Sequence, residues 1–298
     1  MSLFWEKQSS NRKFDLKSFR DTKNHNIFAS WSPYTRGLTF HNFLINYYVN
    51  NHKKDFLKFK KSINNMNIGN PPSIFYQNKF YITYDDCVSF EEISFLLKNF
   101  KKKNITSVIE VGPGYGRMVE TIIKNFKIKN YIVIDYKNIL SLTKKYLLKV
   151  LKKKDFEKII FLNFENFQFQ KDFFIKKYKI KKFDLFFNSD SFHEIEKKII
   201  KKYLDYFSLI SNNFFIKNAV GKYKPNDLIN HLTKNKVPSN IKNLGLCNEE
   251  INIFDKSKLK TQAKKFLKRY NPYKRCKKID YEFSEIYQST LLSFFKKN

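Results

Sequence analysis

Short apolar segments alternate with amphipathic segments through the middle of this 298-residue chain. Five of the apolar segments have the length and the β-branched and aromatic content of buried strands: 107–111, 130–134, 158–162, 183–187 and 214–220. The segments between them carry apolar residues at helical spacing. Strands that alternate with helices in this way predict an α/β fold around a parallel sheet. A later apolar stretch, Gln288–Phe295, is suitable for a final strand.

The first 85 residues follow a different pattern and predict an arm followed by a helical accessory region. Residues 1–37 show no periodicity, which is typical of an extended arm or a partly ordered lid. The first helix after the arm is expected to bury one aromatic face, formed by Phe40, Phe43, Leu44, Tyr47 and Tyr48. A second helix is expected over Lys53–Ile63, and Phe75–Tyr84 alternates loosely, as in a short hairpin.

The boundary between the two parts is predicted near residue 86. Ser89 and Glu92 fit a capping box at the start of a helix that would pack against the sheet. Residues 1–85 are therefore interpreted as the accessory region and residues 86–298 as the second domain. A polar, lysine-rich insertion at about 221–276 interrupts that domain, and its structure cannot be predicted from the pattern.

The most distinctive stretch, V-I-E-V-G-P-G-Y-G-R at 108–117, holds three of the seven glycines. A buried strand, a glycine turn and a helix form a nucleotide-binding element, because glycine allows close approach and a helix N-terminus favours anions. A dinucleotide fingerprint would need its third glycine at position 117, where Arg117 stands. The glycines here are Gly112, Gly114 and Gly116, and Glu110 precedes them. A glycine turn without a ligand is the alternative.

Polar residues follow the second and third predicted strands. Asp135 ends the strand 130–134, where an open α/β sheet places its ligand, and its carboxylate could accept hydrogen bonds from both ribose hydroxyls of an adenosine. It lies 19 residues beyond Gly116, the separation expected for such a unit. A helix cap is the alternative role for Asp135. Asn163 ends the third strand, either near an adenine or in a surface turn.

These motifs together resemble class I methyltransferases that use S-adenosylmethionine (SAM). The resemblance covers about residues 86–220 and rests on Glu110–Arg117, Asp135 and the segment N-S-D-S-F-H-E-I at 188–195. Three segments, Ile68–Pro71, Glu110–Arg117 and Phe183–Glu194, also resemble bacterial sugar O-methyltransferases of surface-glycan gene clusters. The resemblance implies a Rossmann-like sheet of seven strands, one of them antiparallel, and SAM as the cofactor. It implies cofactor contacts from Glu110, Gly112, Gly114, Gly116, Asp135, Asn163 and Asn188, with Arg117 as a partner for the SAM carboxylate.

Methyl transfer to oxygen needs a group that removes the hydroxyl proton. His193 is the preferred general base, because it follows the fourth strand and its ordinary pKa suits neutral pH. Asp190 and Glu194 are alternative bases, or they orient the imidazole. Ser191 and Glu194 also fit a capping box, which would make His193 part of a helix's first turn. A metal site formed by Asp190, His193 and Glu194 is conceivable. No further residues with the spacing of metal ligands support it, so no metal site is predicted.

The net charge of +31 is an ambiguous signal for partners. Only six of the 58 basic residues are arginine, the residue preferred for bidentate recognition of phosphates and bases, which argues against nucleic acid. The lysines are spread throughout the chain, as the codons of an AT-rich genome would produce. Attraction to an anionic acceptor, such as a nucleotide-sugar or a lipid-linked glycan, is the other interpretation, and a peripheral contact with an anionic membrane is compatible with it.

Three scattered cysteines and a start without a signal-peptide pattern predict a soluble, cytoplasmic protein. Three functions follow as hypotheses. The first is a SAM-dependent O-methyltransferase of sugar hydroxyls in the synthesis of surface glycans. The second is a methyltransferase of another acceptor, a small molecule or RNA. The third is a catalytically silent module that keeps the SAM fold and binds an anionic partner.

Overall fold

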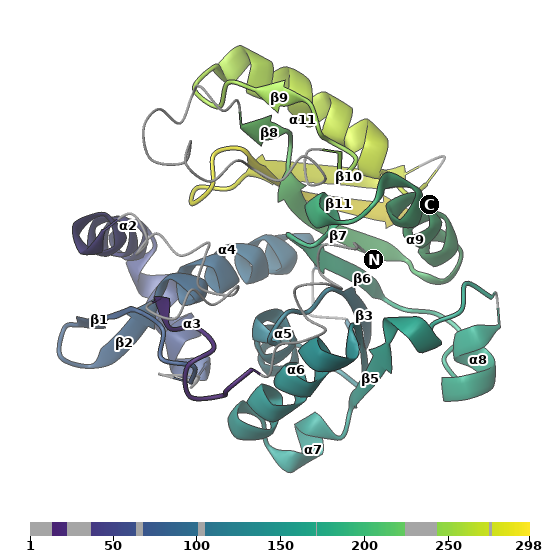
Figure 1. Ribbon diagram of the computed structural model, residues 1–298, viewed down its shortest axis with the longest axis horizontal. Helices are drawn as coiled ribbons and strands as arrows, with labels where there is room; N and C mark the ends of the chain where they lie inside the picture. The colour runs from purple at the N-terminus through teal and green to yellow at the C-terminus, as the bar shows by residue number, and fades with distance from the viewer. Residues whose placement is uncertain are drawn as a thin grey trace.

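A seven-stranded sheet runs through the centre of the computed structural model (Figure 1). The structure describes residues 14–22, 37–63, 68–100, 105–170, 172–223, 243–273 and 276–298. The strands of the sheet are β3 (Ser107–Val111), β4 (Asn130–Asp135), β5 (Ile159–Asn163), β6 (Leu185–Ser189), β7 (Asn213–Ala219), β10 (Cys276–Phe283) and β11 (Thr290–Lys297). Their spatial order is β10-β11-β7-β6-β3-β4-β5.

The direction of the strands agrees with the predicted Rossmann-like fold. The pairs β5–β4, β4–β3, β3–β6 and β6–β7 are parallel, whereas β11 runs antiparallel to both β7 and β10. The stretch Gln288–Phe295 is therefore correctly predicted to contain a strand. The sequence did not reveal β10, because its exposed lysines and acidic residues hide the alternation of an edge strand.

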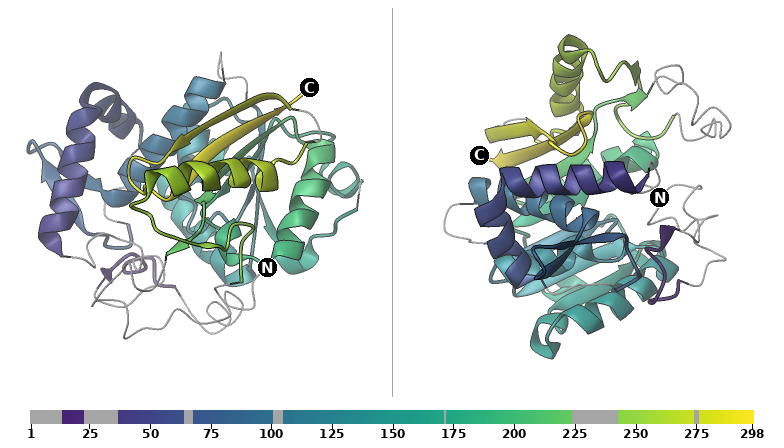
Figure 2. Two further views of the ribbon diagram at one scale, coloured as in Figure 1. Left: turned by 90° about the horizontal axis from the view of Figure 1, so that it is seen from above. Right: turned by 90° about the vertical axis from the view of Figure 1, so that its left-hand side faces the viewer.

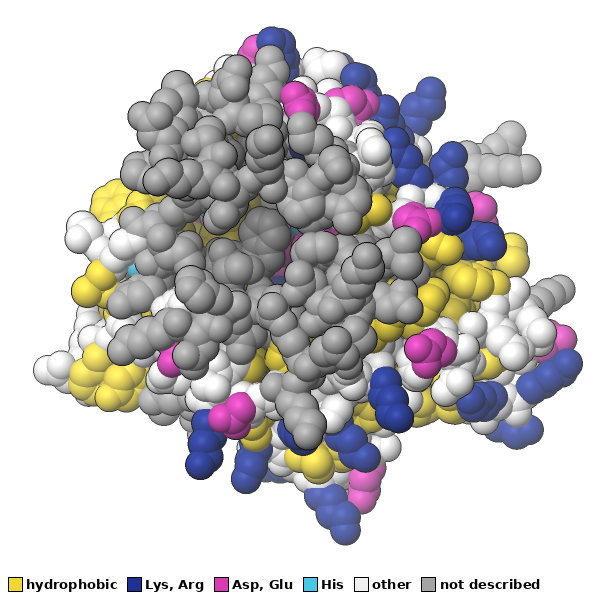
Figure 3. All heavy atoms as spheres, in the orientation of Figure 1, with side chains coloured by type: hydrophobic (Ala, Val, Ile, Leu, Met, Phe, Trp, Pro, Cys, Tyr) yellow, Lys and Arg dark blue, Asp and Glu magenta, His cyan; other side chains and the backbone are white. Residues whose placement is uncertain are grey.

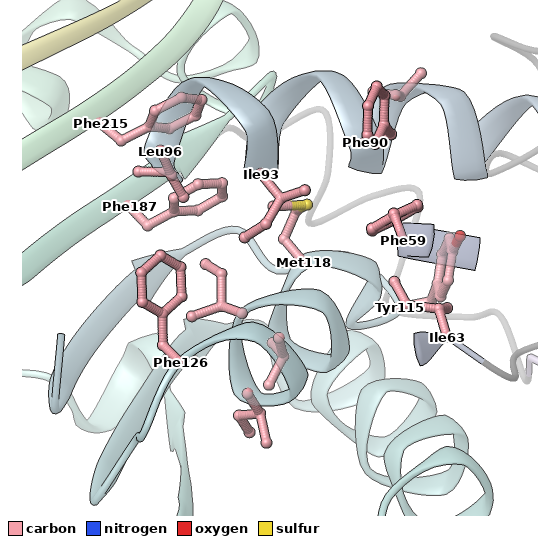
Figure 4. Packing of buried hydrophobic residues seen from close by; sticks show 14 of the residues in the cluster. Phe59, Ile63, Phe90, Ile93, Leu96, Tyr115, Met118, Phe126, Phe187 and Phe215 are labelled. Atoms are coloured by element: carbon pink, nitrogen blue, oxygen red, sulfur yellow. The ribbon is translucent and has the colours of Figure 1, made fainter. Parts of the chain in front are cut away.

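Helices cover both faces of the sheet, and strand alternation divides the core between them. On β3, Val108 belongs to the core below α4 (Tyr84–Asn99), whereas Ile109 belongs to the core on the opposite face. The first face also carries α5 (Arg117–Asn125) and α6 (Lys137–Val150). The opposite face carries α8 (Phe173–Tyr178), α9 (Lys197–Ile210) and α11 (Lys256–Tyr270). Figure 4 shows Ile93 and Leu96 of α4 beside Phe187 and Phe215 of the sheet.

The accessory region packs against α4. It consists of α2 (Leu38–Asn51), α3 (Lys53–Ser62) and the predicted hairpin, formed by β1 (Ser73–Tyr76) and β2 (Phe80–Thr83). Figure 2 shows this region at one end of the molecule, with α8 and α9 toward the other. The predicted buried face of α2 is wrong for its most aromatic members, since Phe40, Phe43 and Tyr47 are exposed. The buried residues are His41, Ile45, Tyr48 and Val49, and Tyr48, a member of the predicted face, packs against Phe90 of α4.

Helix α4 begins earlier than predicted. Thr83 is its N-cap and forms a capping box with Asp86, so the prediction that Ser89 and Glu92 cap the helix is wrong. Both residues lie inside α4, which leaves their side chains available for other partners. Residue 86, the predicted domain boundary, also lies inside this helix. The same helix therefore contacts the accessory region with its first turns and the sheet with its last turns.

The insertion contributes a small substructure beside the sheet. Its described part contains β8 (Lys222–Tyr223), which pairs in parallel with β9 (Glu250–Ile251), and α11. Residues 224–242 lie outside the described part, as do 1–13 and 23–36 of the predicted arm. In the described ranges, no helix has the length and apolarity needed to cross a membrane. Figure 3 shows Lys and Arg side chains dispersed over several parts of one face.

Candidate cofactor and acceptor site

The glycine turn between β3 and α5 adopts a backbone that only glycine accommodates without strain. Gly112, Gly114 and Gly116 have φ values of 74°, 56° and 100°. A β-carbon on Gly112 would lie 2.5 Å from the side chain of Ser191, which follows β6. Gly116 is the N-cap residue of α5. The turn therefore brings the start of α5 close to the carboxyl ends of β3 and β6, as the sequence predicts.

Asp135 lies beside this turn at the carboxyl end of β4. Its carboxylate accepts hydrogen bonds from the backbone N–H of Tyr136, at 2.8 Å, and of Gly114. Burial raises the pKa of Asp135 to about 7, although both hydrogen bonds act in the opposite direction. In the sheet, Asp135 is paired with Asn163, so the two predicted cofactor residues are neighbours. Asn163 caps the short helix that follows it and donates to Glu165 at 2.9 Å.

Glu110 is buried within the sheet rather than exposed at its edge. The hydroxyl of Tyr131 on β4 donates to its carboxylate at 2.7 Å. Burial raises the pKa of Glu110 to about 8, and the hydrogen bond from Tyr131 and the charge of Arg117 only partly offset the effect of burial. Glu110 consequently holds its proton at neutral pH in this structure. Its position supports an indirect role beneath the glycine turn.

Asn188 joins three strands through its side-chain amide. The amide nitrogen donates to the backbone oxygen of Val111 on β3 at 2.9 Å, and the amide oxygen accepts from Asn218 on β7 at 2.9 Å. Asn188 is fully buried. Ser191 also donates to Val111, at 3.1 Å, and makes no side-chain cap, so the alternative capping box with Glu194 is wrong. These bonds fix the segment after β6 against the glycine turn.

Arg117 is held by α4. One terminal nitrogen (Nη2) donates to both carboxylate oxygens of Glu92, at 3.0 and 3.1 Å, and the other (Nη1) donates to Ser89 at 3.0 Å. The side chain is 15 % exposed. A guanidinium carries five N–H donors, so these contacts leave donors for a further anion. The predicted contact of Arg117 with a cofactor carboxylate stays compatible with this arrangement.

Asp190 and Lys217 form an ion pair at the carboxyl end of β6. Asp190 follows β6 with a left-handed φ of 60°, and its carboxylate accepts from the Lys217 ammonium at 2.8 Å. Partial burial raises the pKa of Asp190, but Lys217 and His193 outweigh it, so that its pKa lies below the ordinary value. Lys217 also donates to Glu92 at 2.9 Å. Lys217 and its contact with Glu92 are not among the predicted site residues, although a lysine inside the apolar strand 214–220 is a visible signal.

His193 lies in a short 3₁₀ turn, Phe192–Glu194, rather than in a long helix. Its Nδ1 is 3.4 Å from the amide oxygen of Asn218, and its Nε2 is 3.4 Å from the carboxylate of Glu194. The imidazole is 21 % exposed. The three predicted catalytic residues thus share one loop. No group of three His, Cys, Asp or Glu side chains in the described ranges has an arrangement suited to a metal ion.

Phe19 and Arg20 of the arm contact the glycine turn through Tyr115. Arg20 forms an ion pair with Asp85 at 2.8 Å and lies 5.2 Å from the centre of the Tyr115 ring. Tyr115 belongs to the glycine turn and donates its hydroxyl to Asp85 at 2.7 Å. Phe19 packs against the same ring, with 5.1 Å between the ring centres. The sequence does not predict this contact, because residues 14–22 show no periodic pattern.

Comparisons with known proteins return structural neighbours but no sequence relatives. No protein-family model and no curated protein matches the chain. Among solved structures, the chain is similar to the methyltransferase domain of bacterial CtHen1, with 13% identity over 70% of this chain and 98% of that chain, at a TM-score of 0.45. It is also similar to the mitomycin 7-O-methyltransferase MmcR, with 8% identity over 72% of this chain and 56% of that chain, at 0.44.

A third similar structure is described as PigF with SAH, with 11% identity over 72% of this chain and 58% of that chain, at a TM-score of 0.44. The chain thus spans somewhat more than half the length of MmcR and PigF. Similarity at this level identifies neither the cofactor nor the acceptor of this chain.

Proposed function

We propose that this chain is a SAM-dependent O-methyltransferase. The observation that carries the proposal is the place of Asp135 beside the glycine turn: the backbone oxygen of Ile134, the residue before it on β4, accepts from the Gly112 backbone N–H at 2.9 Å. An acidic strand end and a glycine turn then form one wall at the carboxyl edge of a parallel sheet, the edge at which such sheets bind ligands. The sheet order and the antiparallel β11 agree with the class I fold that the motifs resemble.

The side chains around this wall fit the parts of SAM. Asp135 suits the two ribose hydroxyls, because a carboxylate accepts two hydrogen bonds at once. Asn163, its neighbour in the sheet, suits the adenine side. The remaining donors of Arg117 suit the carboxylate of the methionyl part. When bound, SAM supplies an activated methyl group and a neutral thioether leaving group.

Residues after β6 carry the proton chemistry in this proposal. His193 accepts the proton of the acceptor hydroxyl as its oxygen forms the new bond to carbon, and it becomes an imidazolium. Asp190, whose pKa is lowered by Lys217 and His193 despite partial burial, stays ionised and stabilises that positive charge. Glu194 lies 3.4 Å from Nε2, where its charge also stabilises the imidazolium after the proton is transferred. General-base catalysis of this kind contributes about 10² to 10⁴-fold to the rate.

A sugar hydroxyl is the proposed acceptor, presented on a nucleotide-sugar or a lipid-linked glycan. The resemblance of Ile68–Pro71 and of the two motif segments to sugar O-methyltransferases supports this choice, as does the low arginine content. On the face drawn in Figure 3, the Lys and Arg side chains of the described residues lie in several separate places. Surface-glycan synthesis in the cytoplasm is the proposed setting.

Methyl transfer from labelled SAM tests the acceptor class. The purified chain is incubated separately with a panel of nucleotide-sugars, with lipid-linked glycans and with total RNA. Label in a sugar product and none in RNA is the expected result, and label in RNA alone would replace the sugar by a nucleic-acid acceptor. His193→Ala should bind SAM normally and lose turnover about 10²-fold or more. Unchanged turnover in that variant would remove His193 as the base.

A further inference from the structure

Lys217 is a fully buried lysine in the interior strand β7. Its neighbours in that strand are buried as well, and its side chain has no exposed surface. Burying an ammonium group costs several kcal/mol unless anionic partners surround it. A lysine that served only to fill the core would be less stable than an apolar side chain of similar volume. The position therefore calls for an explanation beyond packing.

The ammonium group of Lys217 joins two carboxylates. It donates to Glu92 on α4 at 2.9 Å and to Asp190 after β6 at 2.8 Å. The Tyr287 ring lies 5.8 Å from the ammonium nitrogen on another side. Burial lowers the pKa of Lys217, but the two carboxylates and Glu91 raise it more strongly, so Lys217 is a cation at neutral pH. The orientation of the Lys217 side chain is thus determined by Glu92, Asp190 and Tyr287, which come from three parts of the fold.

Glu92 is the buried anion that keeps Lys217 in place. The Glu92 oxygen that accepts from Lys217 also accepts from Arg117 at 3.0 Å and from the Ser189 hydroxyl at 2.8 Å. Glu92 has no exposed side-chain surface, whereas Asp190 is 40 % exposed. Two anions and two cations balance in this cluster of Arg117, Glu92, Lys217 and Asp190. Asp190 is its most exposed member, and it lies at the edge of the proposed site.

The backbone of Asp190 is fixed as firmly as its side chain. Its φ of 60° is an uncommon conformation for a residue other than glycine, and such conformations persist where the surroundings enforce them. The backbone N–H of Asp190 donates to the backbone oxygen of Lys217 at 2.7 Å. The same two residues are therefore joined through both the main chain and the side chains. The carboxylate keeps one orientation beside the segment that carries His193.

We propose that Lys217 is a positioning residue that holds the Asp190 carboxylate toward the transferred methyl, with Glu92 as the counterion that keeps Lys217 inside the sheet. The inference rests on the proposed function, since it assumes SAM in the site. A carboxylate held there recognises the positive charge of the sulfonium. It therefore favours SAM over S-adenosylhomocysteine (SAH), which lacks both the methyl group and the charge.

The ratio of the two affinities distinguishes this role from a purely structural one. Loss of stability or of pocket shape weakens SAM and SAH alike, whereas loss of a directed carboxylate weakens SAM selectively. Calorimetric titration of the full chain with SAM and with SAH gives the ratio. One charge–charge contact in a partly exposed site corresponds to about tenfold in affinity.

Two variants test the two ends of the inference. Asp190→Asn removes the negative charge that is proposed to face the sulfonium. The double variant Lys217→Met/Glu92→Gln removes the ammonium group that holds Asp190 together with its counterion, so the net charge of the cluster stays zero. The glutamine at position 92 still offers an oxygen to Arg117 and Ser189. Both should lower the preference for SAM over SAH about tenfold. The matched control is Lys60→Met/Asp86→Asn, which removes another buried ion pair, of 2.8 Å, in the accessory region and should leave the ratio unchanged.

The outcomes separate the inference from the proposed function. An unchanged ratio in Asp190→Asn, or a change there without one in the Lys217→Met/Glu92→Gln variant, overturns the role of Lys217. A similar fall of the ratio in the control also overturns it, because the effect would then follow from destabilisation. If the unaltered chain binds neither SAM nor SAH, the proposed function itself fails.

Discussion

Arg117 and Glu92 connect the glycine turn to the interior of α4 through an ion pair with N–O distances of 3.0 and 3.1 Å. Arg117 is the first residue of α5, and Glu92 lies near the middle of the helix that also carries the accessory region. Figure 4 shows Met118, the next residue of α5, packed below Ile93 of α4. The accessory region and the cofactor side of the sheet are therefore coupled by charge as well as by apolar packing.

Replacement of Glu92 by alanine should destabilise the chain severely. The change leaves Arg117 and Lys217 without their shared anion, and removal of one partner from a buried ion pair costs about 3 to 5 kcal/mol. Chemical denaturation followed by circular dichroism measures the difference in unfolding free energy. Glu196→Gln is the control, because Glu196 pairs with the exposed Lys198 and should change stability by less than about 1 kcal/mol. Equal effects of the two changes would contradict a buried network.

The stability of the ligand-free chain should fall as the pH rises from 5 to 8. Glu110 has a pKa of about 8 in the folded chain against 4.5 as the ordinary value, because it is buried. The unfolded chain thus releases this proton at lower pH, and stability is lost as the pH rises through the folded pKa, by at most about 1.4 kcal/mol per pH unit. Asp135, with a pKa of about 7, acts in the same direction.

Thermal unfolding at several pH values measures this slope. Glu110→Gln keeps an acceptor for the Tyr131 hydroxyl and removes the titration, so it should flatten the loss of melting temperature between pH 5 and 8. The control is Glu165→Gln, at an exposed position after β5, which should leave the slope as it is. A slope that Glu110→Gln does not alter would show that Glu110 titrates normally in the folded chain.

Alanine at position 112 should disrupt the site locally. The φ of 74° costs an alanine about 1 to 2 kcal/mol, and its β-carbon would lie 2.5 Å from the Ser191 side chain. Gly112→Ala should therefore lower the melting temperature and weaken SAM binding. The double variant Gly112→Ala/Ser191→Gly relieves the clash and leaves the backbone strain, so partial recovery is expected. No difference between the single and the double variant would argue against the contact with Ser191.

Arg20 should contribute to cofactor affinity although it lies outside the sheet domain. Its ion pair with Asp85 and its position over Tyr115 support the glycine turn. Arg20→Ala leaves Asp85 with the Tyr115 hydroxyl alone, and a several-fold loss of SAM affinity in calorimetry is expected, together with a lower melting temperature. Lys17→Ala, an exposed change in the same segment, is the control. Unchanged affinity in Arg20→Ala would limit these residues to a role in stability.

The sequence predicts the parts of the fold that depend on local pattern. The strand Ser107–Val111, the glycine turn and the acidic end of β4 are all found where apolar periodicity and glycine spacing place them. These features are recognisable because burial on both faces produces continuous apolar runs, and because a positive φ restricts the residue type. The seven-stranded sheet is likewise as expected from the resemblance to class I methyltransferases.

Contacts between distant segments could not be predicted in the same way. Glu92 and Lys217 are 125 residues apart, and nothing in either local pattern indicates the other. The spacing of Ser89 and Glu92 predicts a helix cap, but another pair, Thr83 and Asp86, forms the capping box and begins the helix earlier. The aromatic residues of α2 share one face, but tertiary packing buries the adjoining face that carries His41, Ile45 and Val49, which the local pattern does not indicate.

Calorimetric titration with SAM tests the central claim most directly. The intact chain should bind about one equivalent of SAM, and Asp135→Ala should weaken that binding by about tenfold or more, because it removes the acceptor for the ribose hydroxyls. Asp155→Ala, at a partly exposed ion pair before β5, should bind as the unaltered chain does. Absence of binding heat with intact, folded chain, or equal affinity in Asp135→Ala, would contradict the assignment of this edge of the sheet as a SAM site.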